Sequence, residues 1–472
     1  MTHVETDICI IGAGSGGLSV AAGAAQMGAR VVLVEGGEMG GDCLNAGCVP
    51  SKALIAAAKH AHAMTTGAAF GVTPVAPQVD FAAVKDHVAR VIAAIAPMDS
   101  QQRFEGLGVQ VIRDWATFRS PTELDAGGHL IRARRFVIAT GSRPFVPPIP
   151  GVEDVPYLTN ETVFALRERP EHLIVIGGGP IGIEMAQAHR RLGCRVTVVE
   201  GARALGRDDP EMAAVVLDAL RAEGVVIIEG APVVRLAGGP GAIEVVLSDG
   251  QTVTGSHLLM AVGRVVALER LNLEAAGVAF TRKGVTVGAD LRSSNRRVYA
   301  VGDAAGGLQF THVAGYHGGV ILRAMLFGLP ANAKTGHIPW VSYTDPELAQ
   351  VGLSEAEART AHGDALTVLR HSYHDNDRAQ TEGRTHGLIK VMVVRGRPVG
   401  VSIAGAQAGE LIGLWALAIS ARLKMGAIAG MVLPYPTLGE VSKRAAGAYF
   451  SPRLFANPMV KRVVRLVQRV LP

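Results

Sequence analysis

The sequence predicts an α/β protein with two Rossmann-like domains and a final α+β domain. The first observation is a β-α-β pattern over the first 35 residues, where the apolar strand DICIIGAG leads through a glycine turn into a small-residue helix and a second strand. The second observation is that this pattern returns at 172–200 and again ends in a glutamate. The third is a change near residue 339, after which strands and helices mix without a glycine fingerprint.

Length and composition are those of a multidomain globular protein. A chain of 472 residues indicates roughly two to four domains, and its formal charge of +5 is too mild to favour nucleic acid as a partner. No signal peptide is visible, and the longest apolar stretches, such as LIGLWALAIS, are shorter than the roughly 18 residues that cross a bilayer. We therefore expect a cytoplasmic protein.

The first glycine set joins the first strand to the first helix. It consists of Gly12, Gly14 and Gly17, and Glu35 follows eighteen residues further on. Glycines permit a tight turn and close backbone approach, the helix start then faces a pyrophosphate, and the acid accepts hydrogen bonds from ribose hydroxyls. This context predicts a dinucleotide site, and the alternative is a tight turn without a ligand.

The second glycine set repeats this spacing. It consists of Gly177, Gly179 and Gly182, with Glu200 eighteen residues further on. Two such sites predict two nucleotides, or one flavin and one nicotinamide dinucleotide. Glu200 favours NADH over NADPH because a carboxylate repels a 2'-phosphate, although Arg203 and Arg207 lie just beyond and could receive that phosphate.

Two of the four cysteines stand close together in GGDCLNAGCVPSK. A zinc site needs three or four ligands at short spacing, and a structural disulfide has little to stabilise across so short a loop. The remaining interpretation is that Cys43 and Cys48 cycle between dithiol and disulfide beside one nucleotide. Lys52 and the helix start at PSK are available to lower the pKa of a thiol in this pair.

These motifs together resemble those of the flavin-dependent pyridine nucleotide-disulfide oxidoreductases. The resemblance covers nearly the full length and rests, in order, on the first fingerprint, GGDCLNAGCVPSK, ATGSRP, the second fingerprint, AVGDAAG, YTDPELAQVG and PYPTLGE. It implies bound FAD, NAD(P)H as the electron donor, and a homodimer formed through the final domain. Four segments follow from it: 1–148 (first part of the FAD-binding domain), 149–268 (NAD(P)-binding domain), 269–338 (second, central part of the FAD-binding domain) and 339–472 (dimerisation domain).

The resemblance also implies roles for individual residues. Cys43 would be the thiol that meets the substrate, and Cys48 the thiol nearer the flavin that forms a charge-transfer contact. Lys52 would lie close to the flavin ring and pair with Glu184. Further cofactor contacts are expected at Gly141 and Asp303 for FAD and at Gly263 for NAD.

The chain departs from this family at the position of its acid/base. Relatives usually read His-Pro-Thr-x-x-Glu near the end, whereas this chain has Tyr435 in place of the histidine and keeps Glu440. A phenol with an ordinary pKa near 10 is a poor base at neutral pH, so exchange with dithiols is disfavoured. Tyrosine here is similar to the mercuric reductase branch, but the vicinal cysteine pair and the Cys-x-x-Cys module of that branch are missing.

Other polar residues add smaller expectations. Asp42 stands where relatives usually have Thr or Ser, and we expect it to raise the pKa of Cys43 or to repel anionic substrates. The stretch HSYHDND has HxxHD spacing, but a polar loop is favoured over a metal site, and no metal site is predicted. His312 and His317 are expected to be packing or capping residues rather than catalysts.

The tail MVKRVVRLVQRVLP has Val460, Val463, Val464 and Val467 on one helical face and Lys461, Arg462, Arg465 and Arg469 on the other. It is expected to dock on its own dimer, and the alternative is weak contact with an anionic membrane or an acidic partner.

The sequence thus predicts a flavoprotein that moves electrons from NADH through FAD to the cysteine pair and on to a small-molecule or metal-ion acceptor, such as mercuric ion or a small disulfide. One alternative is dihydrolipoamide dehydrogenase. Another is an electron-transferring or regulatory flavoprotein module for a protein partner.

Overall fold

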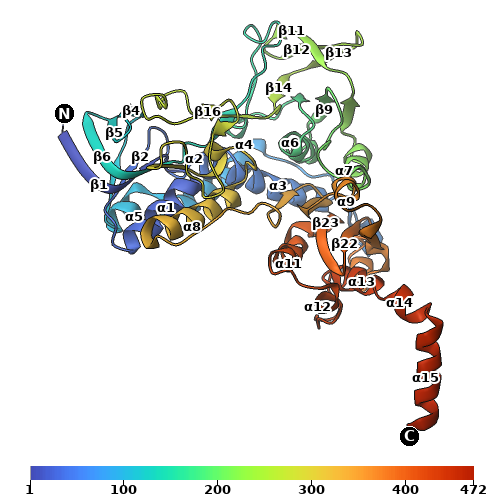
Figure 1. Cartoon of the computed structure of the whole chain (residues 1–472). Helices are drawn as coiled ribbons and strands as arrows, with labels where there is room; N and C mark the ends of the chain where they lie inside the picture. The colour runs from blue at the N-terminus through green and yellow to red at the C-terminus, as the bar shows by residue number, and fades with distance from the viewer. Residues whose placement is uncertain (1, 472) are drawn as a thin grey trace. The chain divides into compact units, whose positions relative to one another are not determined.

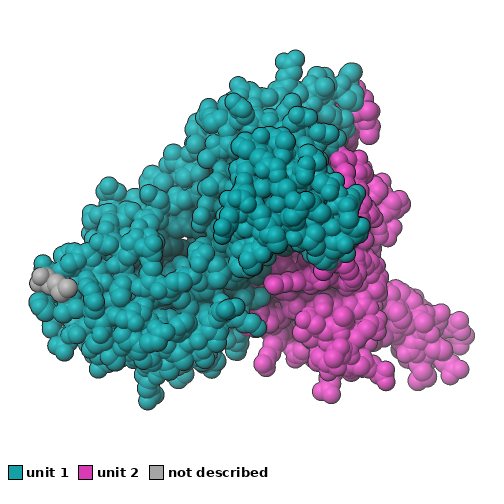
Figure 2. Space-filling model, turned by 90° about the horizontal axis from the view of Figure 1, so that it is seen from above, with its two compact units in different colours: residues 1–67, 73–201, 230–334 teal, residues 68–72, 202–229, 335–472 magenta. Residues whose placement is uncertain are grey.

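The computed structural model describes residues 2–471 (Figure 1). The chain forms two compact units, which Figure 2 shows in different colours. Unit 1 comprises the residues up to 67, 73–201 and 230–334, and unit 2 comprises 68–72, 202–229 and the residues from 335 onward. Unit 2 thus includes part of the segment predicted as NAD(P)-binding, and the four predicted boundaries stay a prediction.

The larger sheet of unit 1 is built on the long strand β1 and its parallel neighbours. Five strands are parallel: β3 (Val109–Ile112), β2 (Val31–Val34), β1 (Thr2–Ile11), β6 (His129–Ile138) and β18 (Val298–Ala300). The antiparallel pair β4 (Ala116–Ser120) and β5 (Glu123–Ala126) joins the first half of β6. Because β6 has ten residues, its second half still pairs with β18 along the same edge.

Both faces of β1 are covered in its second half, which explains the continuous apolar run from Ile8 to Ile11. Ile8 and Ile10 pack with α1 (Ser15–Gln26) and α8 (Thr311–Phe327), which lie along one face of the sheet together with α5 (Gln101–Gly106) (Figure 1). Cys9 and Ile11 point to the opposite face and pack with apolar residues of the β4–β5 pair and of 266–285.

The second βαβ unit repeats this design in a smaller sheet. Its parallel strands are β9 (Arg195–Glu200), β8 (His172–Ile176) and β14 (His257–Met260), and α6 (Pro180–Arg191) connects β8 to β9. Three antiparallel strands follow: β11 (Val233–Gly239), β12 (Ala242–Leu247) and β13 (Thr252–Gly255). The chain enters this region after β7 (Ser142–Pro144) and leaves it through β15 (Arg264–Val266), and these two strands pair antiparallel.

Unit 1 also contains the helices that carry the cysteine motif. These are α2 (Gly41–Asn45) and α3 (Cys48–Ala63), with α4 (Phe81–Ile95) packed against α3. The remaining strands are β16 (Phe280–Thr281) and β17 (Gly284–Val285).

Unit 2 is built on an antiparallel sheet of five strands. Their order is β19 (Pro339–Ser342), β20 (Glu347–Gly352), β23 (Arg397–Gly405), β22 (Leu388–Val394) and β21 (Leu366–Ser372). The other elements are β10 (Val226–Glu229), α7 (Pro210–Ala222), α9 (Glu355–His362), α10 (Asp377–Thr381), α11 (Ala408–Ser420), α12 (Met425–Ala429), α13 (Glu440–Ala448), α14 (Ser451–Phe455) and α15 (Pro458–Val470). Trp415 of α11 anchors the core, and its indole donates to Ser442 Oγ at 3.0 Å.

The predicted fold class is confirmed, since two βαβ units precede an α+β region built on an antiparallel sheet. Among the described residues, no helix has the length and apolar character that a membrane span requires.

Candidate active site

The first glycine fingerprint lies between β1 and α1. Gly12 has φ +105°, and a Cβ there would come within 2.4 Å of the Ala139 carbonyl oxygen. A Cβ on Gly17 would lie 1.8 Å from the Gly12 oxygen, so the turn itself requires these two glycines. Gly14 differs, because its nearest neighbour would be 3.9 Å away. The space at Gly14 fits a pyrophosphate that approaches the backbone at the start of α1.

The second fingerprint has the same geometry between β8 and α6. Gly177 has φ +109°, and a Cβ there would lie 2.3 Å from the Ala261 oxygen, while a Cβ on Gly182 would lie 2.0 Å from the Gly177 oxygen. A Cβ on Gly179 would meet nothing within 4 Å. The middle glycine of each fingerprint is thus the one that the protein's own packing does not require, which fits a ligand at both turns.

The two acids close these turns in matching ways. Glu35 accepts hydrogen bonds from the backbone N–H groups of Ala13 and Gly37 at 2.5 and 2.6 Å. Glu200 accepts one from Gly178 at 2.7 Å. Each carboxylate therefore stands beside the glycine turn, where a ribose would be recognised.

Two more glycines lie just beyond the strands that flank these turns. Gly141 after β6 has φ +66°, and Gly263 after β14 has φ +125°. Both adopt the left-handed region that favours glycine.

The cysteine loop places its two thiols on two short helices. Cys43 lies in α2, and Cys48 is the first residue of α3. The helix α3 begins at Cys48, two residues before the start expected at PSK. Pro50 is accommodated within the first turn, because its missing N–H costs no hydrogen bond there. The positive end of the helix dipole therefore lies at Cys48.

The thiols have opposite acidities. Both are free, and a hydrogen bond from Cys43, with further help from Thr311 and Lys52, lowers the pKa of Cys48 to about 6. The same contact with Cys48, together with burial, raises the pKa of Cys43. Thr311 Oγ1 lies 3.2 Å from Cys48 Sγ. In the dithiol state, Cys48 is therefore the thiolate and Cys43 the neutral thiol.

Lys52 lies one helical turn after Cys48 and donates to Glu184 of α6 at 2.8 Å. The Glu184 side chain is buried, whereas that of Lys52 is partly exposed. This ion pair fixes a cation near the thiolate and joins α3 to the helix of the second fingerprint.

Asp42 is held by two partners that the sequence analysis did not identify. Arg264 lies 3.2 Å from its carboxylate, and Asn160 donates to it at 2.9 Å. The pKa of Cys43 is raised, but by Cys48 and burial, whereas the charge of Asp42 acts on Cys48, as the smallest of several influences, and raises its pKa. The expected repulsion of anionic substrates stays a prediction.

Asp303 belongs to the same polar chain. It accepts a hydrogen bond from Ser142 Oγ at 2.5 Å, and Arg264 Nε donates to that hydroxyl at 2.7 Å. Burial raises the pKa of Asp303. Arg264 directly follows Gly263, a predicted cofactor contact, so its position in the sequence is a signal for a residue of the site. No sequence signal marks Thr311 or Asn160.

Tyr435 and Glu440 belong to unit 2. Tyr435 is 70% exposed and donates to Asp377 Oδ2 at 3.0 Å, and this hydrogen bond raises the pKa of the phenol. Glu440 begins α13, and its Oε2 is buried without a hydrogen-bond partner. The phenol is thus even less suited to act as a base than its ordinary pKa implies.

The histidines lie at separate places. His317 is buried and its Nδ1 accepts from the Gly302 N–H at 3.2 Å, while His312 stacks on Phe310 with ring centroids 5.3 Å apart. His371 is the second-last residue of β21, and His374 lies in the short helical turn that follows. Within residues 2–471, no three His, Cys, Asp or Glu side chains come together as a metal site.

Residues 6–318 match the pyridine nucleotide-disulphide oxidoreductase family, and residues 338–446 match its dimerisation domain. The chain belongs to this family, as its motifs predicted. It is an FAD-dependent oxidoreductase with a pyridine-nucleotide site, a redox-active cysteine pair and a dimerisation domain.

Relatives within the family have several substrates. The mercuric reductase of Streptomyces lividans is 35% identical over 464 residues, covering 95% of this chain and 97% of the relative. The dihydrolipoyl dehydrogenase of Bacillus subtilis is 31% identical, covering 93% and 97%. A solved structure, the Cu(II) complex of the HOCl-induced flavoprotein disulfide reductase RclA from Escherichia coli, is 27% identical with a TM-score of 0.85, covering 94% and 99%.

Proposed function

We propose that this protein uses NADH to reduce a soft metal ion or a small oxidant through the Cys43–Cys48 pair. The observation that carries the proposal is the combination of a thiolate-forming Cys48 with a tyrosine in place of the usual histidine base. Metal-ion reduction by one thiolate and one thiol only has to release the Cys43 proton, whereas dithiol exchange needs a base that deprotonates the incoming thiol.

The residues fit the two cofactors. The turn of Gly12, Gly14 and Gly17, with Glu35, Gly141 and Asp303, would hold FAD, and the turn of Gly177, Gly179 and Gly182, with Glu200 and Gly263, would hold NADH. Bound FAD supplies the hydride acceptor that links NADH to the disulfide. The Glu200 carboxylate beside Gly178 supports NADH over NADPH, because it would repel a 2'-phosphate.

Within the dithiol, the two cysteines have different tasks. The thiolate of Cys48 is stabilised by Cys43, Thr311 and Lys52, whereas Cys43 keeps its proton and meets the acceptor. Glu184 positions Lys52. The Cys48 thiolate and the Cys43 thiol return to the disulfide by giving up two electrons and one proton. The two electrons reduce one mercuric ion to the metal or two cupric ions to cuprous ions, and the proton passes to solvent.

The proposed acceptor class has independent support in the relatives. The Streptomyces lividans protein is named for mercuric ion, and the Escherichia coli structure is named as a Cu(II) complex. Tyr435, with its raised pKa, would remain a neutral phenol bonded to Asp377 rather than act as a base, and Glu440 would support its loop. We further propose a cytoplasmic homodimer formed through the dimerisation domain of the segment 339–472, whose match ends before α15.

Dihydrolipoamide dehydrogenase activity is the second candidate. It is favoured by the relative from Bacillus subtilis, which matches this chain over a similar length. A module that passes electrons to a protein partner is the third candidate.

An anaerobic panel of acceptors distinguishes these functions. We expect NADH oxidation with mercuric or cupric ions to exceed that with lipoamide or glutathione disulfide by at least about tenfold, which corresponds to about 1.4 kcal/mol in transition-state stabilisation. Tyr435→His is the matched variant and should raise lipoamide turnover. Lipoamide turnover equal to metal turnover in the parent chain would contradict the proposal.

A further inference from the structure

The helix α15 is a sharply two-sided surface that the described chain leaves uncovered. At 100° per residue, its apolar side chains occupy one arc of about 160° and its basic side chains occupy the opposite side. The apolar arc contains Met459, Val460, Val463, Val464, Leu466, Val467 and Val470, and Leu471 follows the helix as its C-cap. All of these except the half-buried Val460 are exposed.

The charge of this segment has a single sign. Lys461, Arg462, Arg465 and Arg469 lie on the polar side, and residues 449–471 contain no Asp or Glu. Arg462 borders one edge of the apolar arc, whereas Gln468 borders the other edge and Lys461 lies just beyond it. This arrangement places cations near both edges of an apolar strip, where the phosphates of an anionic bilayer would lie around a helix embedded in its surface.

The same charges argue against a second copy of α15 as the partner that covers its apolar face. Two such helices packed apolar face to apolar face would bring Lys461 and Arg462 against like charges, with no acid in 449–471 to compensate. The family's dimerisation domain matches only as far as residue 446, so α15 lies outside it. The helix has 13 residues, about 20 Å in length, and can lie in a bilayer surface but not cross the bilayer.

We propose that α15 (red, Figure 1) binds the surface of an anionic phospholipid bilayer, with its valine-rich face inserted and its basic face toward the headgroups. The enzyme then acts at a membrane surface without a membrane-spanning segment among the described residues. Both the apolar contact and the charge attraction are required, so binding weakens as salt screens the headgroups.

Cosedimentation of the full-length, FAD-loaded enzyme with lipid vesicles tests this proposal. We expect binding to vesicles of mixed phosphatidylcholine and phosphatidylglycerol and not to vesicles of phosphatidylcholine alone. Val463→Asp, at the centre of the apolar arc, should lower the partition coefficient by about tenfold. Gln468→Asp adds the same charge outside that arc and should cause a smaller decrease.

NADH-dependent reduction of FAD should be unchanged in both variants, which shows that they fold. Equal losses in the two variants, equal binding to neutral vesicles, or no vesicle binding at all would overturn the proposal. Light scattering measures the oligomeric state of each variant. If Val463→Asp converts a dimer into monomers, the apolar face is a subunit contact and the proposal is wrong.

Discussion

At the scale of single residues, the reactivity of the site depends on one hydroxyl that the sequence does not reveal. Thr311 lies 263 positions from Cys48 in the chain, yet its Oγ1 is 3.2 Å from the sulfur. The pKa of Cys48, lowered to about 6, makes the thiolate dominant at neutral pH and removes it as the pH falls below 6.

Thr311→Val should raise the pKa of Cys48 by about one pH unit, because it removes a hydrogen bond to the thiolate without changing the size of the side chain. The pH dependence of alkylation of the reduced enzyme measures this pKa. Thr360→Val in α9 removes a hydroxyl far along the chain and serves as the control. An unchanged or lower pKa in Thr311→Val would show that the hydroxyl does not stabilise the thiolate.

Asp42 has the opposite effect to Thr311 on the pKa of Cys48. Its negative charge raises the pKa of Cys48 against the effect of Lys52, and its partner Arg264 is largely buried. Asp42→Asn should therefore lower the Cys48 pKa by about half a pH unit. Asp42→Glu keeps the charge and should leave the same alkylation profile nearly unchanged, so a rise of the pKa in Asp42→Asn would refute this role.

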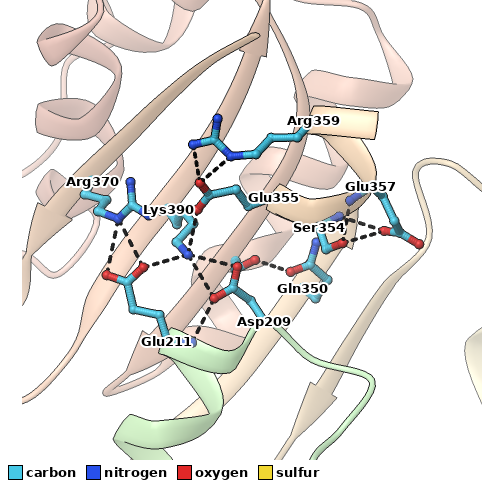
Figure 3. A network of polar contacts seen from close by, with 10 residues as sticks. Asp209, Glu211, Gln350, Ser354, Glu355, Glu357, Arg359, Arg370 and Lys390 are labelled. Carbon is cyan, nitrogen blue, oxygen red and sulfur yellow. Dashed lines mark hydrogen bonds and ion pairs between the residues drawn. The ribbon is translucent and has the colours of Figure 1, made fainter. Parts of the chain in front are cut away.

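At the scale of elements, a buried ion cluster ties α7 to the antiparallel sheet of unit 2 (Figure 3). Lys390 of β22, only 3% exposed, contacts carboxylates of Asp209, Glu211 and Glu355 at 2.7–2.9 Å. Arg370 of β21 bridges Glu211 and Glu355. This cluster is one of the contacts that join residues 202–229 to the final domain within unit 2.

Lys390→Met should destabilise unit 2 by roughly 3–5 kcal/mol, because it leaves the buried carboxylate of Asp209 without its cation. The midpoint of urea unfolding measures the loss, and Lys424→Met, at an exposed lysine, is the control. Equal midpoints for the two variants would contradict a stabilising role for the cluster.

The cluster also predicts that unit 2 loses folding stability at low pH. Although burial opposes ionisation, Lys390 and Arg359 lower the pKa of Glu355 to about 2. Because the folded pKa is below the unfolded value, this stabilisation is complete above about pH 4.5 and is lost as the pH falls toward 2. In Lys390→Met, the free energy of unfolding should fall less between about pH 4.5 and pH 2 than in the parent chain.

At the scale of the whole molecule, the sequence predicts the fold class and the family because these depend on local patterns. The two glycine fingerprints, each between a strand and a helix, mark the Rossmann-like units, and the cysteine loop is continuous in sequence. The partners Arg264, Asn160 and Thr311 are brought to that loop only by folding, so no local pattern identifies them. The grouping of 202–229 with the final domain likewise involves Lys390, a lone charge in an apolar strand.

The central claim is that NADH reduces the Cys43–Cys48 disulfide and leaves a thiolate on Cys48. Anaerobic titration with NADH, followed by absorption spectroscopy, tests it most directly. A long-wavelength charge-transfer band should appear on two-electron reduction, fade as the pH falls below about 6, and be absent in Cys48→Ser. In Cys43→Ser, where no disulfide can form, the band should be present before NADH is added. A band that never forms in the parent chain, or that survives in Cys48→Ser, would contradict the account.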